Sequence, residues 1–180
     1  MPSSMSDPLL AQLSAHRWLV PLLADLAAHR GARFVELVHR LDLSRDSLTR
    51  TLAAAAALGW IARNPGHGHP LRPEYILTEA GTAAAARAAT IAKAQAALGL
   101  PPGATTRWGL PLVAGIAAGH DRFNALARLL PPASPRALSQ GLKALGTHRL
   151  VTRELLDLRP PATRYALTAS GRTLAESCAP

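Results

Sequence analysis

The chain contains the octapeptide EYILTEAG at residues 74–81 and a near copy of it, RYALTASG, at residues 164–171. Both follow the pattern Tyr-x-Leu-Thr-x-x-Gly, in which apolar residues alternate before a threonine. Alternation of this kind predicts a short β-strand, and the threonine or the residue after it is suited to open an α-helix. Since the two stretches lie 90 residues apart, they predict the same strand-to-helix junction at two places in the chain.

The similarity extends outward from these two junctions. At the same offset of 90, matching residues recur in the pairs Arg17-Trp18 and Arg107-Trp108, Pro21-Leu22 and Pro111-Leu112, Ser44 and Ser134, Leu48 and Leu138, Leu52 and Leu142, and Arg63 and Arg153. Phe34 matches Phe123 at an offset of 89, so one residue is inserted or deleted in between. Because rare aromatic types hold the register, we predict two copies of one domain, a first repeat at about 1–90 and a second at about 91–180.

The residue pattern of each repeat predicts the same order of helices and strands. In the first repeat the expected elements are three helices, two strands and a last helix, at 18–28, 32–41, 44–58, 60–63, 74–78 and from 78 or 79 onward. In the second repeat the corresponding elements are expected at 105–118, 121–130, 134–147, 149–155, 162–168 and beyond. Ser44 is suited to cap the third helix and Gly59 to end it. This order predicts a winged helix-turn-helix unit, a mainly α fold with short β-hairpin wings (α+β).

An Ala-rich segment connects the two repeats. Residues of high helix propensity continue from about 79 to 99, and Pro101-Pro102-Gly103 follows. We therefore expect one long linking helix between tandem winged helix-turn-helix domains, in a pseudo-twofold arrangement.

The composition favours a polyanionic partner. The net charge is +9, and 18 of the 20 basic residues are arginine. A general bias of the source toward Arg and Ala is the alternative explanation. Residues 1–10 lack the features of a secretory signal, and the apolar run at 109–119 is too short to cross a bilayer, so we expect a cytoplasmic protein with no membrane partner. The single cysteine, Cys178, predicts neither a disulfide nor a metal site, and we expect no cofactor.

Several segments resemble the HxlR family of winged-helix regulators. They include RWLVPLLADL at 17–26, RFVELVHRLDLSRDSLTRTL at 33–52, SPRALSQGLKAL at 134–145 and both Tyr-x-Leu-Thr-x-x-Gly motifs. The resemblance implies a small DNA-binding regulator that normally acts as a homodimer of single-domain chains. Two departures stand out here. Two domains share one chain, which can imitate the dimer as a monomer or pair as a homodimer, and residues 9–15 lack the cysteine that some members use for redox sensing.

The third helix of each repeat would present one face to the DNA major groove. Taking Leu48, Leu52 and Ala55 as buried, the opposite face of the first repeat holds Asp46, Arg50, Ala53 and Ala57. The same face of the second repeat holds Arg136, Gln140, Lys143 and Thr147. Arg and Gln suit guanine and adenine edges, whereas Asp46 is placed to hold Arg50 in an intrahelical ion pair. The second half would therefore specify sequence, unless both faces are simply solvated.

Further candidate contacts are expected at the helix starts and in the wings. The full set of predicted DNA-binding residues is Ser44, Arg45, Ser47, Thr49, Arg50, Arg63, Arg72, Ser134, Arg136, Ser139, Gln140, Lys143, Arg153, Arg159 and Arg164. For Ser44 and Ser134 the alternative role is helix capping, and for Arg63 and Arg153 it is a surface salt bridge. The acids Glu154 and Asp157 would repel phosphate from the second wing, and two histidines in the first wing, His67 and His69, are too few for a metal site.

Two function classes remain open. The leading hypothesis is a transcriptional regulator that binds double-stranded DNA, reads an asymmetric site and responds, in one version, to a small-molecule effector. The alternative is a non-enzymatic protein that sequesters a small molecule on a winged-helix scaffold with weakened DNA binding. A speculative pocket between the repeats would be lined by Trp18 and Trp108, whose other role is core packing. We expect no enzyme, because the sequence shows no nucleophile–base set, phosphate-binding glycine loop or metal cluster.

Overall fold

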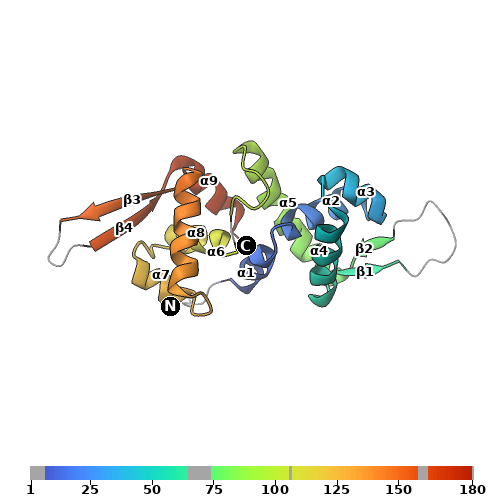
Figure 1. The fold of residues 1–180 in the computed structure, drawn as a ribbon, viewed down its shortest axis with the longest axis horizontal. Helices are drawn as coiled ribbons and strands as arrows, with labels where there is room; N and C mark the ends of the chain where they lie inside the picture. The colour runs from blue at the N-terminus through green and yellow to red at the C-terminus, as the bar shows by residue number, and fades with distance from the viewer. Residues whose placement is uncertain (1–6, 65–73, 106, 158–161, 180) are drawn as a thin grey trace. The chain divides into compact units, whose positions relative to one another are not determined.

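The computed structural model describes residues 7–64, 74–105, 107–157 and 162–179 (Figure 1). These residues form two compact units. The first unit covers the described residues of 18–93. The second combines residues 7–17 with the described residues of 94–179. Each contains a helical core and one antiparallel hairpin, which confirms the predicted mainly α fold with β-hairpin wings. No helix in these ranges is long and apolar enough to cross a membrane.

The first unit follows the predicted order. Its elements are α2 (Leu19–His29), α3 (Phe34–Leu41), α4 (Arg45–Ala57), β1 (Ile61–Arg63), β2 (Tyr75–Leu77) and the start of α5 (Glu79–Ala97). The strands β1 and β2 pair in register from Ile61 opposite Leu77 to Arg63 opposite Tyr75. Leu22, Leu26 and Leu37 are fully buried where α2 meets α3, so the apolar stripes predicted from helical spacing do form the core.

The second unit repeats this order and adds a helix from the other end of the chain. Its elements are α6 (Gly109–Ala117), α7 (Phe123–Leu129), α8 (Pro135–Thr147), β3 (Val151–Leu156), β4 (Ala162–Leu167) and α9 (Ala169–Ser177). Helix α1 (Pro8–Ala15) packs against α6, with Leu10 and Leu13 buried. Residues 8–15 precede the first repeat in the sequence but pack with the second, so the packing units and the sequence repeats divide the chain at different places.

The Tyr-x-Leu-Thr-x-x-Gly motif forms a tight junction in both units. Thr78 caps α5, because its Oγ1 accepts a hydrogen bond from Gly81 N at 2.9 Å, and that hydroxyl donates to the Gly59 carbonyl at 2.6 Å. Thr168 does the same for α9, with Gly171 N at 3.0 Å and the Arg149 carbonyl at 2.7 Å. One side chain therefore ties the start of the last helix to the residue that precedes the hairpin.

The glycines of the motif let the helix approach that segment closely. A Cβ atom on Gly81 would lie 1.7 Å from the Trp60 carbonyl oxygen, and one on Gly171 would lie 2.0 Å from the Leu150 carbonyl oxygen. Both obstacles are backbone atoms, which cannot rotate away as a flexible side chain can. Only glycine therefore fits at these positions without moving the last helix away from the hairpin.

The contact between the first two helices of the unit is ionic in one repeat and apolar in the other. Arg40 on α3 donates from Nε and Nη2 to the Asp25 carboxylate of α2 at 2.9 and 2.7 Å. This hydrogen bonding raises the pKa of Arg40 above its ordinary value, against the opposing effect of desolvation. The second repeat has Gly115 and Leu129 at these places, and a Cβ on Gly115 would lie 2.7 Å from Leu129 Cδ2. The same fold thus tolerates two unlike solutions at this contact.

The close contact at the junction predicts that adding even one methyl group at the glycine strongly destabilises the fold. Gly171→Ala should lower the free energy of unfolding by about 3 kcal/mol, since the added methyl group collides with backbone. Gly146→Ala is the matched control. Gly146 lies in α8, and the nearest atom to an added Cβ is 3.9 Å away, so this change should stabilise by about 0.5–1 kcal/mol. Urea unfolding followed by circular dichroism measures both, and equal effects of the two changes would contradict the proposed role of the junction.

The ionic contact predicts that substitutions of Asp25 and Arg40 have non-additive effects on stability. Asp25→Gly should destabilise the first unit by about 1–2 kcal/mol, because it leaves the Arg40 guanidinium, with a side chain 29% exposed, without its partner. Adding Arg40→Leu recreates the pair found in the second repeat and should recover part of that loss. Thermal unfolding of the two single variants and the double variant gives the coupling energy. Strictly additive effects would show that the ion pair does not couple the helices.

Candidate nucleic-acid interface

The third helix of each unit presents equivalent faces. In α4 the buried residues are Leu48, Thr51, Leu52 and Ala55, and in α8 they are Leu138, Gly141, Leu142 and Leu145, which is the same pattern shifted by 90 residues. Both helices have the predicted serine N-cap: Ser44 Oγ accepts from Ser47 N, and Ser134 Oγ accepts from Ala137 N, each at 3.2 Å. The capping role of both serines is therefore confirmed, and the faces opposite the buried rows point to solvent.

The exposed face of α8 carries long polar side chains that are available for contacts. Arg136, Gln140 and Lys143 are exposed, and their side chains form no hydrogen bond or ion pair with any other described residue. Ser139 is also exposed, whereas Thr147 donates its hydroxyl to the Lys143 carbonyl of its own helix at 3.1 Å. The row thus offers a guanidinium, an amide and an ammonium group at helical spacing along one face.

The corresponding face of α4 is exposed but poorer in donors. Arg50 is the long basic side chain of the row, followed by Ala53 and Ala57. The predicted ion pair between Asp46 and Arg50 is wrong, because the structure places these two described side chains beyond salt-bridge distance. Both residues are exposed, where water screens the attraction and side-chain entropy opposes a fixed pair.

The hydroxyl groups around the start of α4 are largely used within the helix. Ser44 donates to Ser47 Oγ at 3.0 Å, and Thr49 donates to the Arg45 carbonyl at 2.8 Å. The Arg45 guanidinium lies over the Phe34 ring, 5.9 Å from its centroid. Contacts from these residues to phosphate would therefore compete with local partners.

The wings differ in the extent of strand pairing among the described residues and in the contacts of their arginines. Strands β1 and β2 pair over three residues each, whereas β3 and β4 pair over six. Arg63 binds the Glu74 carboxylate at 2.9 Å and lies 5.8 Å from the centre of the Tyr75 ring. Arg153 occupies the equivalent register position opposite Tyr165, yet it forms no ion pair with a described acidic residue. Arg153 is therefore the better placed of the two for an outside contact.

The remaining wing candidates fall into two groups. Arg164 on β4 binds the Asp121 carboxylate with Nε at 2.9 Å, so its charge is engaged in a surface salt bridge. Arg72 and Arg159 lie outside the described residues, as do the histidines of the first wing. On β3, Leu155 is 72% exposed, an apolar wing residue that the sequence patterns did not single out.

The two tryptophans of the proposed pocket precede equivalent helices. Trp18 and Trp108 are the N-cap residues of α2 and α6, and both are half-buried. The Arg107 guanidinium lies 5.5 Å from the centre of the Trp108 ring. Neither tryptophan lines the pocket at the base of the second hairpin or either of two pockets in the first unit, so the ligand role of these rings stays a prediction.

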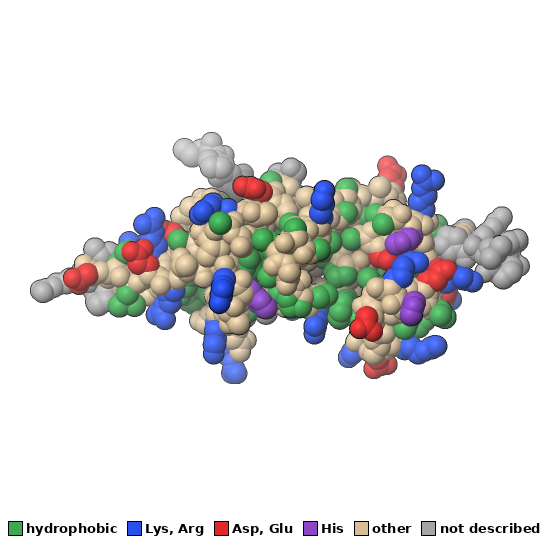
Figure 2. Space-filling model, turned by 90° about the horizontal axis from the view of Figure 1, so that it is seen from above, with side chains coloured by type: hydrophobic (Ala, Val, Ile, Leu, Met, Phe, Trp, Pro, Cys, Tyr) green, Lys and Arg blue, Asp and Glu red, His purple; other side chains and the backbone are tan. Residues whose placement is uncertain are grey.

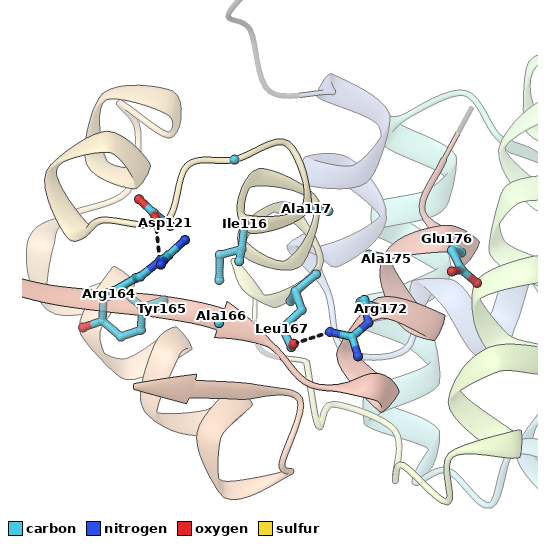
Figure 3. A pocket seen from close by; sticks show the side chains of 11 residues that line it. Ile116, Ala117, Asp121, Arg164, Tyr165, Ala166, Leu167, Arg172, Ala175 and Glu176 are labelled. Atoms are coloured by element: carbon cyan, nitrogen blue, oxygen red, sulfur yellow. Dashed lines mark hydrogen bonds and ion pairs between the residues drawn. The ribbon is translucent and has the colours of Figure 1, made fainter. Parts of the chain in front are cut away.

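The sequence patterns missed a cavity inside the second unit. It is lined from the end of α6, the strand β4 and the helix α9, and it includes Tyr165 and Arg172 (Figure 3). A comparison of the repeats residue by residue, at Ile76 and Ala166 for example, would have signalled that this region differs between the two copies.

The face of the molecule seen in Figure 2 agrees with the basic composition. Figure 2 shows Lys and Arg side chains projecting from the described surface as separate groups, interspersed with acidic and apolar ones. Within the ranges that the structure describes, no three residues of the types His, Cys, Asp and Glu gather to hold a metal ion. The candidate interface therefore consists of exposed side chains on α4, α8 and the wings, and α8 offers the most long hydrogen-bond donors.

A known protein family matches both repeats of the chain. The family model described as HxlR-like helix-turn-helix matches residues 13–97 and again residues 104–179. The Escherichia coli protein YtfH, named an uncharacterised HTH-type transcriptional regulator, is 32% identical over 75 residues, which make up 42% of this chain and 60% of YtfH. The Bacillus subtilis regulator YvaP, with a name of the same kind, is 35% identical over 69 residues, or 38% of this chain and 64% of YvaP.

A third relative extends the same pattern. The Synechocystis protein sll1512, also named an uncharacterised HTH-type transcriptional regulator, is 31% identical over 68 residues, or 38% of this chain and 50% of that protein. The chain thus spans between half and two thirds of the length of these three relatives. No solved structure matches it significantly. Since the family model covers most of the sequence in two successive matches, this chain belongs to the HxlR-like helix-turn-helix family and contains two copies of its domain in tandem.

Proposed function

We propose that this protein is a DNA-binding transcriptional regulator in which one chain imitates a winged-helix dimer. The observation that carries the proposal is the row of Arg136, Gln140 and Lys143 on α8, exposed and without partners among the described residues. Helix α8 occupies the position of the recognition helix in a helix-turn-helix fold, which inserts into the major groove. The names of the relatives, all HTH-type transcriptional regulators, support the same function.

The two halves would read DNA unequally. The burial patterns of α4 and α8 coincide, so equivalent residues face the same way in each unit. In the first repeat Asp46 occupies the position of Arg136 in the second, Arg50 that of Gln140, and Ala53 that of Lys143. The row on α8 therefore carries two positive charges, whereas the charges of Asp46 and Arg50 cancel in the row on α4. We infer that α8 specifies sequence and that α4 adds mainly backbone and shape contacts.

Contacts to the phosphate backbone would come from the helix starts and the wings. On this proposal Ser134 and Ser139 serve α8, and Arg153 serves the second wing. Arg63 and Arg164 would have to leave Glu74 and Asp121 to reach phosphate, so we rank them lower. This proposal includes three further points. The repeats divide at about 1–90 and 91–180, the protein responds to a small-molecule effector, and it acts as a pseudo-dimeric monomer.

The alternative of a sequestering protein has less support. The donor-poor face of α4 motivated it, but the relatives bear names of regulators and the donors on α8 remain exposed. Absence of any DNA binding at low salt would revive this alternative.

Removal of the polar pair on α8 should abolish selectivity. In fluorescence anisotropy with a selected duplex and a mixed-sequence pool, Arg136→Ala/Gln140→Ala should weaken binding to the selected duplex by about 30-fold or more, since each bidentate base contact discriminates by roughly 1–3 kcal/mol. Binding to the mixed pool should fall much less and should weaken steeply with salt. The control Lys93→Ala/Gln12→Ala removes one cation and one amide from exposed positions on α5 and α1 and should leave selectivity unchanged. Equal losses in both double variants would overturn the assignment of α8.

A reciprocal exchange tests the asymmetry. Ala53→Lys places on α4 the cation that Lys143 supplies on α8, so affinity for the mixed pool should rise. The slope of log affinity against log salt concentration should steepen by about one, the release of one counterion. Lys143→Ala should produce the opposite change. Selection from random duplexes should return a site without inverted symmetry. A strict inverted repeat bound by one chain would rule out unequal reading by the two halves.

A further inference from the structure

A pocket of about 620 Å³ opens at the base of the β3–β4 hairpin in the second unit. It is lined by the end of α6 and the loop after it, by β4 and by α9 (Figure 3). Its volume lies within the range of small-molecule sites, about 300–1,000 Å³. All of its lining residues belong to this one unit, so the pocket is defined without reference to the first unit.

The first unit has the same pocket in a smaller form. Its volume is about 370 Å³, and every residue that lines it has a counterpart in the larger pocket, in the pairs Leu26 and Ile116, Ala27 and Ala117, Arg30 and Gly119, Ile76 and Ala166, Leu77 and Leu167, Thr82 and Arg172, and Ala86 and Glu176. Two of these differences, Gly119 and Ala166, remove side-chain volume. Since both units keep the same fold, the fold itself does not require the larger pocket.

The second repeat also supplies charges that the first repeat lacks at these places. Arg172 replaces Thr82, and its Nη1 donates to the Leu167 carbonyl at 2.9 Å, which holds the guanidinium at the pocket. Arg172 forms no ion pair with a described acidic residue, so the remaining N–H groups of its guanidinium are available. The other arginine of the lining, Arg164, is neutralised by Asp121 at 2.9 Å. Arg172 is therefore the cation that a ligand can reach.

Apolar side chains lie between the two arginines. In the view of Figure 3, Ile116 and Leu167 lie between the Arg164 and Arg172 side chains, beside Ala117 and Ala166. An apolar surface next to one held guanidinium suits a molecule with an apolar body and one carboxylate, which accepts two N–H groups of an arginine side by side. We propose that this pocket binds a small organic acid of this kind, with Arg172 on the carboxylate and Ile116, Ala166 and Leu167 on the apolar body.

The proposal makes Glu176 an opposing group. Glu176 replaces Ala86 of the first repeat and lies one helical turn after Arg172 on the rim of the pocket. Its negative charge would repel a ligand carboxylate and would tolerate a neutral or positive ligand better. Glu176→Ala should therefore tighten the binding of an organic acid by up to about fivefold.

The test is a titration of the full ¹⁵N-labelled chain, followed by NMR, with 3-phenylpropionate, hexanoate and indole-3-acetate as probes. At least one acid should shift the amide signals of Ile116, Ala166, Leu167 and Arg172, whereas 3-phenylpropan-1-amine and 3-phenylpropan-1-ol should not. Arg172→Gln should weaken the binding of that acid by about tenfold or more. Ala166→Ile introduces the side chain of Ile76 and should weaken binding by narrowing the pocket without a change of charge.

The matched control is Arg128→Gln, which removes an exposed arginine of α7 outside the pocket and should leave the affinity unchanged. The dispersed spectrum of each variant shows whether it folds. The proposal is overturned if none of the three acids shifts these signals, if the amine or alcohol binds as well as the acid, or if Arg172→Gln keeps the affinity of the unaltered chain. These outcomes do not depend on DNA, so they are independent of the proposed regulatory function.

Discussion

In each unit a glycine leaves no room for a Cβ atom where the last helix meets the entry of the hairpin. Thr78 and Thr168 each join three segments: the end of the recognition helix, the start of the first strand and the start of the last helix. The backbone closes the same junction, since Thr78 N donates to the Trp60 carbonyl at 3.0 Å and Thr168 N to the Leu150 carbonyl at 3.1 Å. Without a Cβ at Gly81 and Gly171, the helix lies directly against that carbonyl. The position of the last helix against the entry of the hairpin depends on this contact.

A junction made from a threonine hydroxyl, backbone groups and glycine leaves most other side chains free to vary. The ion pair of Asp25 and Arg40 in one repeat and the contact of Gly115 with Leu129 in the other illustrate this freedom within the core. The recognition helices illustrate it at the surface, because α4 and α8 share one burial pattern and differ in almost every exposed residue. A duplicated domain can in this way keep its fold while its two copies acquire different contacts.

The second repeat carries the features that suggest recognition. Helix α8 has the better set of donors, and the pocket of this unit is larger and contains Arg172 and Glu176 in place of Thr82 and Ala86. The net charge follows the same division, with +3 for residues 1–93 and +6 for residues 94–180. The pocket and the wing share β4, so a molecule in the pocket would contact the strand that supports the wing. On the proposed function, the second repeat would hold both the specificity and its control.

The sequence alone was enough to predict the duplication, from similarity at an offset of 90 residues, the order of helices and strands, and the caps at Ser44 and Ser134. The order of elements and the caps depend on residues within a few positions of one another, so local chemistry determines them. Only the tertiary structure decided that α1 packs on α6, that Glu74 and Asp121 engage Arg63 and Arg164, and that Asp46 and Arg50 form no ion pair with each other. It also decided where the second repeat opens a pocket. Some of these contacts join residues far apart in the chain, and others depend on competition with water. The spacing of residue types along a sequence reveals neither which distant residues meet nor which pairs water separates.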